Sequence, residues 1–271
     1  MANGIRTMSF AGLHVYESGS PEAPVLLFLH GSPLSGRMWM PQLERLEEFH
    51  CLAPDLPEHG QSQAAAPFSM DDTVRRLAAI VRGARAPEGR AHLIGLSFGG
   101  VVAQALMVEQ PDMVDHVILS GTSAHMSGAL FQAMRLSLAL NRPLLRLLSP
   151  GALATLVRWQ TGLPASVSPL IEDDMKRVDP DSLTRFLLAT YGGIITPTAT
   201  RSPVLVLVGE KETPVARSMA RRLQREIPGA RGAMVRRLGH VWNLQNPDLF
   251  VDVVRAWVRD APLPGPLVPF T

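Results

Sequence analysis

The sequence predicts an α/β fold in which helices flank a mostly parallel sheet of eight strands. Strand-like segments recur along the chain, and from the third onward helix-like stretches separate most of them, which is the order of a parallel sheet with crossover helices. Two segments, PVLLFLHG and PVLVLVGE, are apolar at nearly every position. Strands that are buried on both faces show this pattern, so these two are expected at the centre of the sheet.

The first two strand-like segments, at residues 6–12 and 13–19, meet around Gly12. They predict an antiparallel hairpin at one edge of the sheet. The other six strands are expected at residues 24–31, 50–56, 91–97, 114–121, 202–210 and 232–239.

Two helices are predicted from their first residues. Ser69, with Asp72 three positions later, resembles a capping box. Thr213 followed by Pro214 has the order typical of an N-cap and the first helical position. Both starts are followed by stretches with helical spacing, so each is expected to begin a helix that flanks the sheet.

With 271 residues, of which 46% are hydrophobic, the chain is long enough for one large core and an inserted subdomain. The strand rhythm stops between Gly121 and Arg201, where residues rich in Leu, Met, Ala and Arg take its place. We therefore expect a core at residues 1–121 and 202–260, a helical cap at residues 122–201 inserted after the sixth strand, and a proline-rich tail at residues 261–271. The prolines favour a tail that is extended over the surface or disordered.

Charge and composition exclude several classes of function. Lys and Arg number 26 against 24 Asp and Glu, and the arginines are scattered, so no nucleic-acid partner is expected. Cys51 is the single cysteine, which excludes an internal disulfide and favours a buried structural thiol. The first residues lack the pattern of a secretory signal, and no long apolar run predicts a membrane span, so we expect a cytoplasmic protein without stable membrane insertion.

The stretch LIGLSFGG carries the strongest chemical signal. Gly95, Ser97 and Gly99 form G-x-S-x-G between a buried strand and a helix. In such a sharp turn the backbone is crowded, and glycines beside the serine avoid clashes. This context predicts that Ser97 is a nucleophile rather than a merely structural serine.

A serine hydroxyl needs a base that accepts its proton, and that base needs an acidic group to orient it. Of the eight histidines, His240 follows the last strand and precedes the last helix, which fits the base. His30 and His59 lie in glycine turns and are expected to organise loops. The remaining histidines lie in or beside strand-like segments or at the start of the cap, where satisfied or solvent-facing rings are usual: His14, His50, His92, His116 and His125.

The acid is expected in a loop between the serine and the histidine. After the sixth strand the chain offers no carboxylate, and after the seventh it offers Glu210 and Glu212. Glu212 stands directly before the helix cap and is the preferred candidate, with Glu210 as the alternative. An acyl-transfer site also needs donors for the oxyanion, and the backbone N–H groups of Phe98 and Ser32 are expected to supply them.

Five motifs in this order, LHGSPLSGRMW, APDLPEHGQS, GLSFGG, VGEKE and GHVWNLQNP, resemble those of the α/β-hydrolase superfamily. The resemblance covers nearly the whole chain outside the cap. It is greatest to the branch with small esterases, enol-lactonases, carbon–carbon bond hydrolases and cofactor-free haloperoxidase-like enzymes. By position it implies that Ser97 is the nucleophile, that His240 is the base, and that Ser32 and Phe98 form the oxyanion hole.

The chain departs from the family pattern at three positions. Glu212 stands where the family usually has aspartate, Glu58 replaces a glycine in the loop PEHG, and Gln245 replaces a glutamate before the last helix. Serine at position 97 separates the chain from haloalkane dehalogenases and epoxide hydrolases of this fold, which use an aspartate nucleophile. An acyl-enzyme intermediate is therefore expected.

These features predict a carboxylesterase-like serine hydrolase. Its expected partner is a small-molecule ester, and the chain is expected to act as a monomer or homodimer. A lactonase, a carbon–carbon bond hydrolase or an acyltransferase would use the same machinery, and a ligand receptor with little turnover is the alternative from another class. Neither metal-ligand spacing nor a glycine-rich phosphate loop occurs, so no metal site and no cofactor are expected.

The cap composition favours a lipophilic substrate. Its stretches of Leu, Ala and Met with interspersed arginines, broken at Pro143 and Pro150, predict short amphipathic helices. Met126, Phe131 and Trp159 are candidate lining residues for an uncharged acyl or alkyl group, whereas Trp39 is expected to pack within its own loop. A basic, apolar cap that lies on a membrane surface is the alternative reading of the same composition.

Overall fold

The computed structural model describes residues 4–270, except residues 66, 85–88, 125–127, 129, 130, 134, 138, 139, 141–148, 150, 153, 156, 157, 159–167, 178–181, 183, 184, 187 and 189–194. Much of the expected cap at residues 122–201 falls among these exceptions, so its boundaries stay a prediction.

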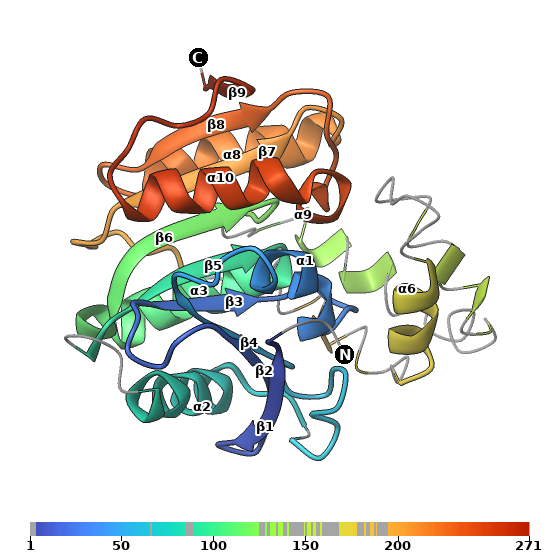
Figure 1. Cartoon of the computed structure of the whole chain (residues 1–271). Helices are drawn as coiled ribbons and strands as arrows, with labels where there is room; N and C mark the ends of the chain where they lie inside the picture. Colours follow the sequence, from blue (N-terminus) through green and yellow to red (C-terminus); the bar gives the residue numbers. More distant parts are fainter. Residues whose placement is uncertain are drawn as a thin grey trace.

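The described residues form a nine-stranded sheet with the order β1-β2-β4-β3-β5-β6-β7-β8-β9 (Figure 1). The strands are β1 (Arg6–Phe10), β2 (Leu13–Ser18), β3 (Val25–Leu29), β4 (His50–Pro54), β5 (Ala91–Leu96), β6 (Val114–Ser120), β7 (Val204–Gly209), β8 (Arg231–Val235) and β9 (Leu267–Pro269). Neighbours from β4 to β8 are parallel, whereas β1, β2 and β9 pair antiparallel. The mostly parallel sheet and the edge hairpin are confirmed.

The tail corrects the expected number of strands, because β9 adds a ninth to the predicted eight. Val268 lies opposite Met234 of β8, and the N–H of Phe270 donates to the carbonyl of Gly232 at 2.9 Å. Pro269 is compatible with this strand because an edge strand leaves one side free of ladder hydrogen bonds. The described part of the tail is therefore attached to the sheet rather than disordered.

Helices cover both faces of the sheet (Figure 1). One face carries α2 (Met70–Gly83), α3 (Phe98–Glu109) and α8 (Pro214–Glu226). The other carries the 3-10 helix η1 (Gly36–Trp39), α1 (Met40–Leu43), α9 (Trp242–Gln245) and α10 (Pro247–Val258). The 3-10 helix η3 (Pro111–Met113) precedes β6, and α6 (Ser168–Met175) belongs to the segment between β6 and β7.

The two predicted helix starts are confirmed by their caps. The hydroxyl of Ser69 accepts a hydrogen bond from the N–H of Asp72 at 3.5 Å, and that of Thr213 accepts one from the N–H of Ala216 at 3.2 Å. Each cap satisfies one of the N–H groups that the first helical turn leaves without a partner.

The central strands divide their side chains between two cores. Leu27 and Leu29 of β3 pack with the core that α2, α3 and α8 cover, whereas Leu26 and Phe28 pack with the core on the opposite face. Because side chains alternate along a strand, a strand that is buried on both faces must be apolar at consecutive positions. This explains the unbroken apolar run that the sequence shows here.

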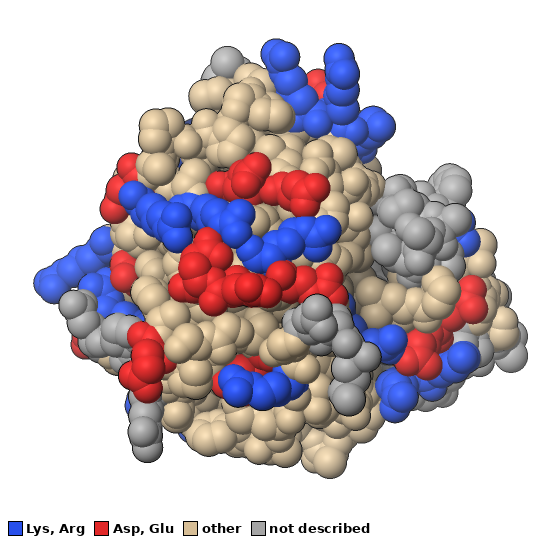
Figure 2. Space-filling view, in the orientation of Figure 1, with Lys and Arg blue, Asp and Glu red and all other residues tan. Residues whose placement is uncertain are grey.

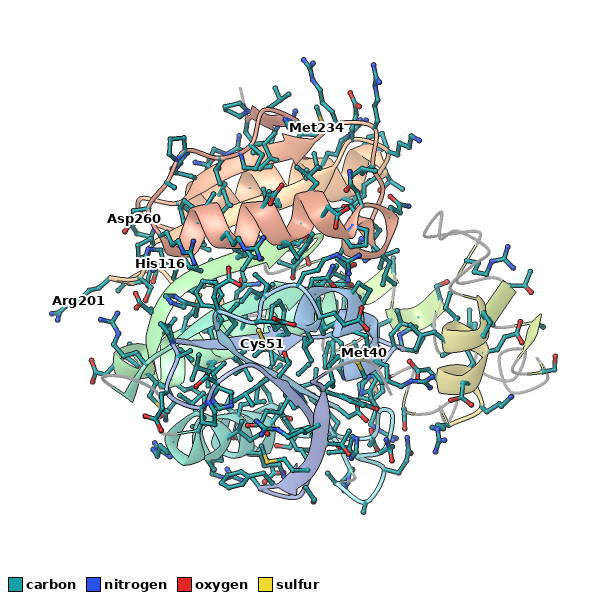
Figure 3. The ribbon with its side chains drawn as sticks, in the orientation of Figure 1. Met40, Cys51, His116, Arg201, Met234 and Asp260 are labelled. Atoms are coloured by element: carbon teal, nitrogen blue, oxygen red, sulfur yellow. The ribbon has the colours of Figure 1, made fainter. Side chains whose placement is uncertain are left out.

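Two single residues are structural. Trp39 is a packing residue, as expected, but it packs beyond its own loop: it is fully buried, and its ring lies 5.2 Å from that of Phe28 in β3 and 5.4 Å from that of Phe250 in α10. Cys51 is buried in β4 (Figure 3). Burial raises the pKa of its thiol to about 12, so the group stays protonated and behaves as a small core residue.

Basic and acidic side chains are interspersed on the face that Figure 2 shows. Arg45 pairs with Asp248 at 2.8 Å, and Arg255 pairs with Glu48 at 2.6 Å. This mixture differs from the basic stripe that is typical of surfaces for nucleic acids. Within the described ranges, no helix combines the length and the apolar character that crossing a bilayer requires.

Candidate active site

Ser97 lies in a sharp turn between β5 and α3. Its backbone has φ 54° and ψ −116°, in the left-handed half of conformational space that non-glycine residues rarely adopt. The N–H of Ser97 donates to the carbonyl of Ser120 at 2.8 Å, which ties the turn to the end of β6. Strain that is held by surrounding structure is characteristic of functional sites, and here it directs one serine out of the end of a strand.

The glycines of the motif make this turn possible. A Cβ atom on Gly95 would lie 2.6 Å from the carbonyl oxygen of Gly99, and a Cβ atom on Gly99 would collide with the carbonyl of Leu29. Any larger residue at either position would push α3 away from β5 and β3. The G-x-S-x-G pattern is thus explained by close backbone approach on both sides of Ser97.

The loop after β3 lies against the same turn. A Cβ atom on Gly31 would lie only 3.2 Å from Cβ of Ser97, so the next residue, Ser32, borders the serine. Phe98 is the first residue of α3, and N–H groups in the first helical turn have no intrahelical acceptor. The backbone N–H groups of the two predicted oxyanion residues therefore belong to segments that meet at Ser97.

Asp55 holds this loop in place, and sequence reasoning missed it. Its carboxylate accepts hydrogen bonds at 2.7 Å from the N–H of Gly36 and at 2.7 Å from the N–H of Gln61. Asp55 is fully buried, and burial raises the pKa of its carboxyl although the two N–H bonds oppose the shift. The sequence did carry a signal for this role: a carboxylate that directly follows strand β4 and precedes Gly60 by five residues.

His240 lies in the loop between β8 and α9, and its ring contacts Glu212 of the loop after β7. Nδ1 of His240 lies 2.8 Å from Oε2 of Glu212. Because an ionised carboxylate only accepts, this bond places a proton on Nδ1, so the neutral form of the ring keeps its lone pair on Nε2. A Cβ atom on Gly121 would lie 2.9 Å from the imidazole, so the pair sits at the end of β6 beside the strand that precedes Ser97.

The structure separates the two candidate acids. Glu210 points elsewhere, since its Oε2 accepts a hydrogen bond from the N–H of Arg237 at 2.7 Å. Glu212 turns back toward β7: its N–H donates to the carbonyl of Gly209 at 3.1 Å, and its Oε1 accepts the N–H of Gly209 at 3.0 Å. Of these two glutamates, Glu212 is the one that contacts His240.

Gln245, where the family usually has glutamate, supports the histidine loop. Its Oε1 accepts a hydrogen bond at 2.8 Å from the N–H of Gly239, the residue directly before His240. An amide oxygen makes this bond as well as a carboxylate oxygen does, so the replacement keeps the loop in position.

The environment of His240 favours its protonated form. Burial of the ring lowers the pKa, but the hydrogen bond to Glu212 and the charge of that carboxylate outweigh burial. The pKa of His240 is therefore raised above the usual 6.5. An imidazole with a raised pKa is a stronger base in its neutral form, which suits proton abstraction from a hydroxyl group.

His30 and His59 organise loops, as the sequence predicts. Nε2 of His30 accepts the N–H of Leu56 at 2.9 Å, and Nδ1 of His59 lies 3.0 Å from the carbonyl of Pro57. Both rings are fully buried, and burial lowers the pKa of each, to about 4 for His59. Each of these rings is held by the backbone of its loop, whereas His240 contacts a carboxylate, so His240 is the better candidate for the base.

Glu58 connects the loop after β4 to the segment between β6 and β7. Its side chain is 5% exposed and accepts a hydrogen bond from Nη2 of Arg185 at 2.6 Å. Phe186, the next residue, packs its ring 4.0 Å from that of His59 and 5.4 Å from that of Phe98. The charge that replaces the family glycine is therefore paired, and an aromatic cluster lies directly beside it.

A second connection joins α6 to the loop after β3. The hydroxyl of Ser35 lies 3.0 and 2.9 Å from the two carboxylate oxygens of Asp174. Burial raises the pKa of Asp174 to about 6, and the neighbouring Asp55 adds to the rise, whereas Ser35 and Arg37 oppose it. The described part of the expected cap is thus attached to the two loops that border Ser97.

The candidate lining residues are placed only in part. Phe131 is described and half-buried, whereas Met126 and Trp159 lie outside the described residues. The substrate contacts of these three residues therefore stay a prediction.

Comparisons with known proteins identify the family of the chain. Residues 26–253 match the sequence profile of the alpha/beta hydrolase family. The chain is 30% identical over 258 residues to an AB hydrolase superfamily protein of Gibberella zeae, an alignment that covers 92% of this chain and 85% of that protein. It is 27% identical over 251 residues to a carboxylesterase of Bacillus subtilis, which covers 88% of this chain and 81% of that protein.

Solved structures give the same picture of the fold. The enol-lactonase from Burkholderia xenovorans LB400 superposes with a TM-score of 0.77 at 22% identity, over 94% of this chain and 100% of that one. A thermophilic esterase from Thermogutta terrifontis superposes with a TM-score of 0.76 at 22% identity, over 94% and 98% of the two chains. Because the profile and the Gibberella relative both extend over most of its length, the chain belongs to the alpha/beta hydrolase family.

Proposed function

We propose that this protein is a serine hydrolase that cleaves carboxylic esters of small, lipophilic molecules through an acyl-enzyme on Ser97. The observation that carries the proposal is the 2.8 Å contact between His240 and Glu212 at the end of β6, next to a serine in a strained turn. A base that is oriented by an acid beside a serine hydroxyl is the arrangement that activates a serine nucleophile.

In the proposed reaction, the hydroxyl of Ser97 attacks the ester carbonyl while Nε2 of His240 takes its proton. The N–H groups of Ser32 and Phe98 stabilise the oxyanion of the tetrahedral intermediate. His240 then returns the proton to the departing alcohol, which leaves an ester between the acyl group and Ser97. Water, activated by the same histidine, releases the carboxylic acid and restores the hydroxyl. Glu212 stabilises the imidazolium in both halves of the cycle.

Two features support an uncharged substrate. The aromatic cluster of Phe98, Phe186 and Phe68 is apolar and follows directly on the serine, and Glu58 beside it is neutralised by Arg185. A site with such surroundings favours a lipophilic acyl or alkyl group over a charged one. All the groups used in the reaction are side chains and N–H groups of the protein, so the proposal requires neither a metal nor a cofactor.

The test is hydrolysis of p-nitrophenyl esters of increasing acyl length by the wild type and by Ser97→Ala. We expect turnover that depends on acyl length and that is lost in the variant. Parallel assays on a lactone and on an amine or alcohol acceptor separate an esterase from a lactonase or an acyltransferase by product. Inert wild-type protein that is nevertheless stabilised by an ester analogue would contradict the hydrolase and favour a receptor.

A further inference from the structure

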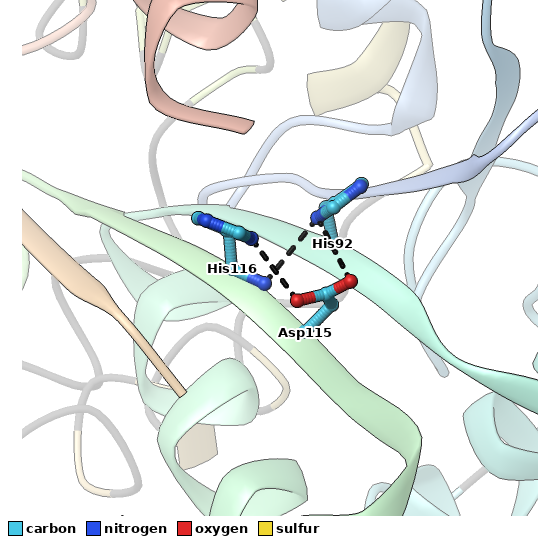
Figure 4. Close-up of side chains that lie close together, drawn as sticks. All are labelled: His92, Asp115 and His116. Atoms are coloured by element: carbon cyan, nitrogen blue, oxygen red, sulfur yellow. Dashed lines mark hydrogen bonds and ion pairs between the residues drawn. The ribbon is translucent and has the colours of Figure 1, made fainter. Parts of the chain in front are cut away.

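A second group of ionisable side chains lies at the amino ends of β5 and β6. It consists of His92, Asp115 and His116, whose donor atoms all lie within 4.8 Å of one another (Figure 4). Ser97 follows the carboxyl end of β5. This group therefore lies at the other end of the same strands, away from the candidate active site. Spacing along the sequence does not reveal it, because more than twenty residues separate His92 from the other two.

A β-bulge brings the three side chains together. Ala91 pairs with Val114 and Leu93 pairs with Val117, so His92 alone stands opposite both Asp115 and His116. A bulge sets two residues against one and re-aims their side chains, which would otherwise point to opposite faces of the sheet. The N–H of His116 donates to Nδ1 of His92 at 3.3 Å, as Figure 4 shows.

The hydrogen bonds show what a bound ion would displace. Nδ1 of His92 accepts the N–H of His116, so it carries a lone pair and no proton, and an ion would take the place of this N–H. Nε2 of His116 lies 3.2 Å from Oδ1 of Asp260, two residues after the end of α10 (Figure 3). Nδ1 of His116 lies within hydrogen-bond distance, 3.0 Å, of Oδ1 of Asp115, so an ion bound here would displace the proton between these two atoms.

The distances around Asp115 complete the group. Its Oδ1 lies 3.0 Å from Nδ1 of His116, and its Oδ2 lies 4.0 Å from Nδ1 of His92. Two imidazole nitrogens and a carboxylate thus converge from adjacent strands. A carboxylate that orients a histidine from outside, as Asp260 does for His116, is the usual support for a metal-binding imidazole.

We propose that His92 Nδ1, His116 Nδ1 and the carboxylate of Asp115 bind a divalent transition-metal ion of the zinc type, with Asp260 orienting His116. Nitrogen donors favour Zn²⁺, Co²⁺ or Ni²⁺ over Mg²⁺ and Ca²⁺, which take oxygen ligands. Tetrahedral coordination at usual bond lengths needs donor separations of about 3.3 Å, and the separations present lie within 4.8 Å. Asp115 is 35% exposed, so water has access to the remaining coordination position.

Arg90 limits the affinity of this site. Its Nη2 donates to the carbonyl of Val114 at 2.8 Å and lies 3.7 Å from Oδ1 of Asp115. This positive charge opposes a bound cation, so Arg90→Gln is expected to tighten binding. A bound ion would link β5 and β6 and, through Asp260, the end of α10. Its role is therefore to stabilise the fold, independently of the serine chemistry.

The test is titration of the untagged, chelator-treated full chain with ZnCl₂ by isothermal calorimetry, together with the visible absorption of bound Co²⁺. We expect one ion per chain and a rise in Tm with zinc concentration, because the ion binds the folded state. Asp260 only orients His116, and Asp260→Asn should weaken zinc binding by roughly 10–100-fold. Asp115→Asn and His116→Asn each remove a ligand and should weaken it by more than that.

His240→Ala is the matched control, since it removes an imidazole that also contacts a carboxylate but lies at the candidate active site. It should keep stoichiometric binding at the proposed site. Failure of the wild type to bind zinc at millimolar concentration, or equal binding by wild type, Asp115→Asn and His116→Asn, would overturn the proposal. The group would then be a hydrogen-bond network in which His116 contacts Asp115 and Asp260. Circular dichroism of each variant without metal shows that it is folded.

Discussion

Glu212 contacts His240 at 2.8 Å although its side chain is one methylene longer than the aspartate that is usual at this position. The loop absorbs the extra length by turning Glu212 back onto Gly209, whose N–H holds the other carboxylate oxygen at 3.0 Å. The carboxylate is thereby fixed by two partners at once. A longer acid can therefore orient the imidazole, provided that this turn is preserved.

Replacing the acid by its amide tests this arrangement. Glu212→Gln should lower kcat for p-nitrophenyl butyrate by about 10⁴-fold, since an amide can donate to Nδ1 and stabilise the wrong tautomer of His240. Glu210→Gln is the matched control and should leave kcat nearly unchanged, because Glu210 binds the N–H of Arg237 instead. A larger loss in Glu210→Gln than in Glu212→Gln would reverse the assignment.

The raised pKa of His240 predicts the pH dependence of activity. The base must be neutral, so kcat/KM should fall as pH decreases through a midpoint above 6.5. In Glu212→Gln the hydrogen bond to a charged acceptor is lost while burial, which lowers the pKa, remains. The midpoint of the residual activity should then move to lower pH. A midpoint that is the same in both proteins would show that Glu212 does not set the pKa of this histidine.

Asp174 predicts a pH dependence of stability. Its pKa is raised from 3.8 to about 6, so the folded state binds a proton more tightly than the unfolded state. Below about pH 4 this carboxyl group is protonated in both states and does not disfavour folding. As pH rises through about 6, the free energy of unfolding falls by roughly 2–3 kcal/mol, because the unfolded state loses the proton first. Asp174→Asn does not ionise and can still accept from Ser35. In urea unfolding, its stability relative to wild type should increase between pH 4 and pH 7; a constant difference would contradict this account.

The pair of Glu58 and Arg185 predicts a coupled effect of two substitutions. Arg185→Ala should destabilise the protein by about 1–2 kcal/mol, because it leaves the nearly buried carboxylate of Glu58 without its cation. The loss is moderate because Arg185 is itself partly exposed to solvent. Glu58 has φ 65°, a conformation that glycine adopts at least cost. Glu58→Gly should therefore stabilise the Arg185→Ala protein. Additive effects of the two changes in urea unfolding would show that the pair is not coupled.

Linear motifs predicted the core well because each has a local cause. The apolar runs of β3 and β7, the caps at Ser69 and Thr213 and the glycines around Ser97 each follow from backbone geometry within a few residues. The segment LVP escaped prediction since its neighbouring prolines suggested a free tail. Only the position of β8 as the last of the parallel strands shows that a ninth strand can pair there.

Features that depend on tertiary register were open or missed in the sequence. The sequence favours Glu212 over Glu210 but keeps both in one loop, and the turn onto Gly209 determines which of them contacts His240. Asp55 acquires its role from two loops that meet only in the folded chain. The meeting of His92 with Asp115 and His116 needs a one-residue bulge between β5 and β6, and the sequence pattern carries no sign of it.

Covalent labelling tests the central claim most directly. The wild-type protein is treated with a fluorophosphonate, which reacts with activated serines, and the modified residue is identified by peptide mass spectrometry, with Ser97→Ala and His240→Ala treated in parallel. We predict stoichiometric modification of Ser97 with loss of esterase activity, no modification in Ser97→Ala and greatly slowed modification in His240→Ala. An unmodified Ser97 in folded wild-type protein, or equal labelling rates in wild type and His240→Ala, would contradict the proposal that His240 activates Ser97 as the nucleophile.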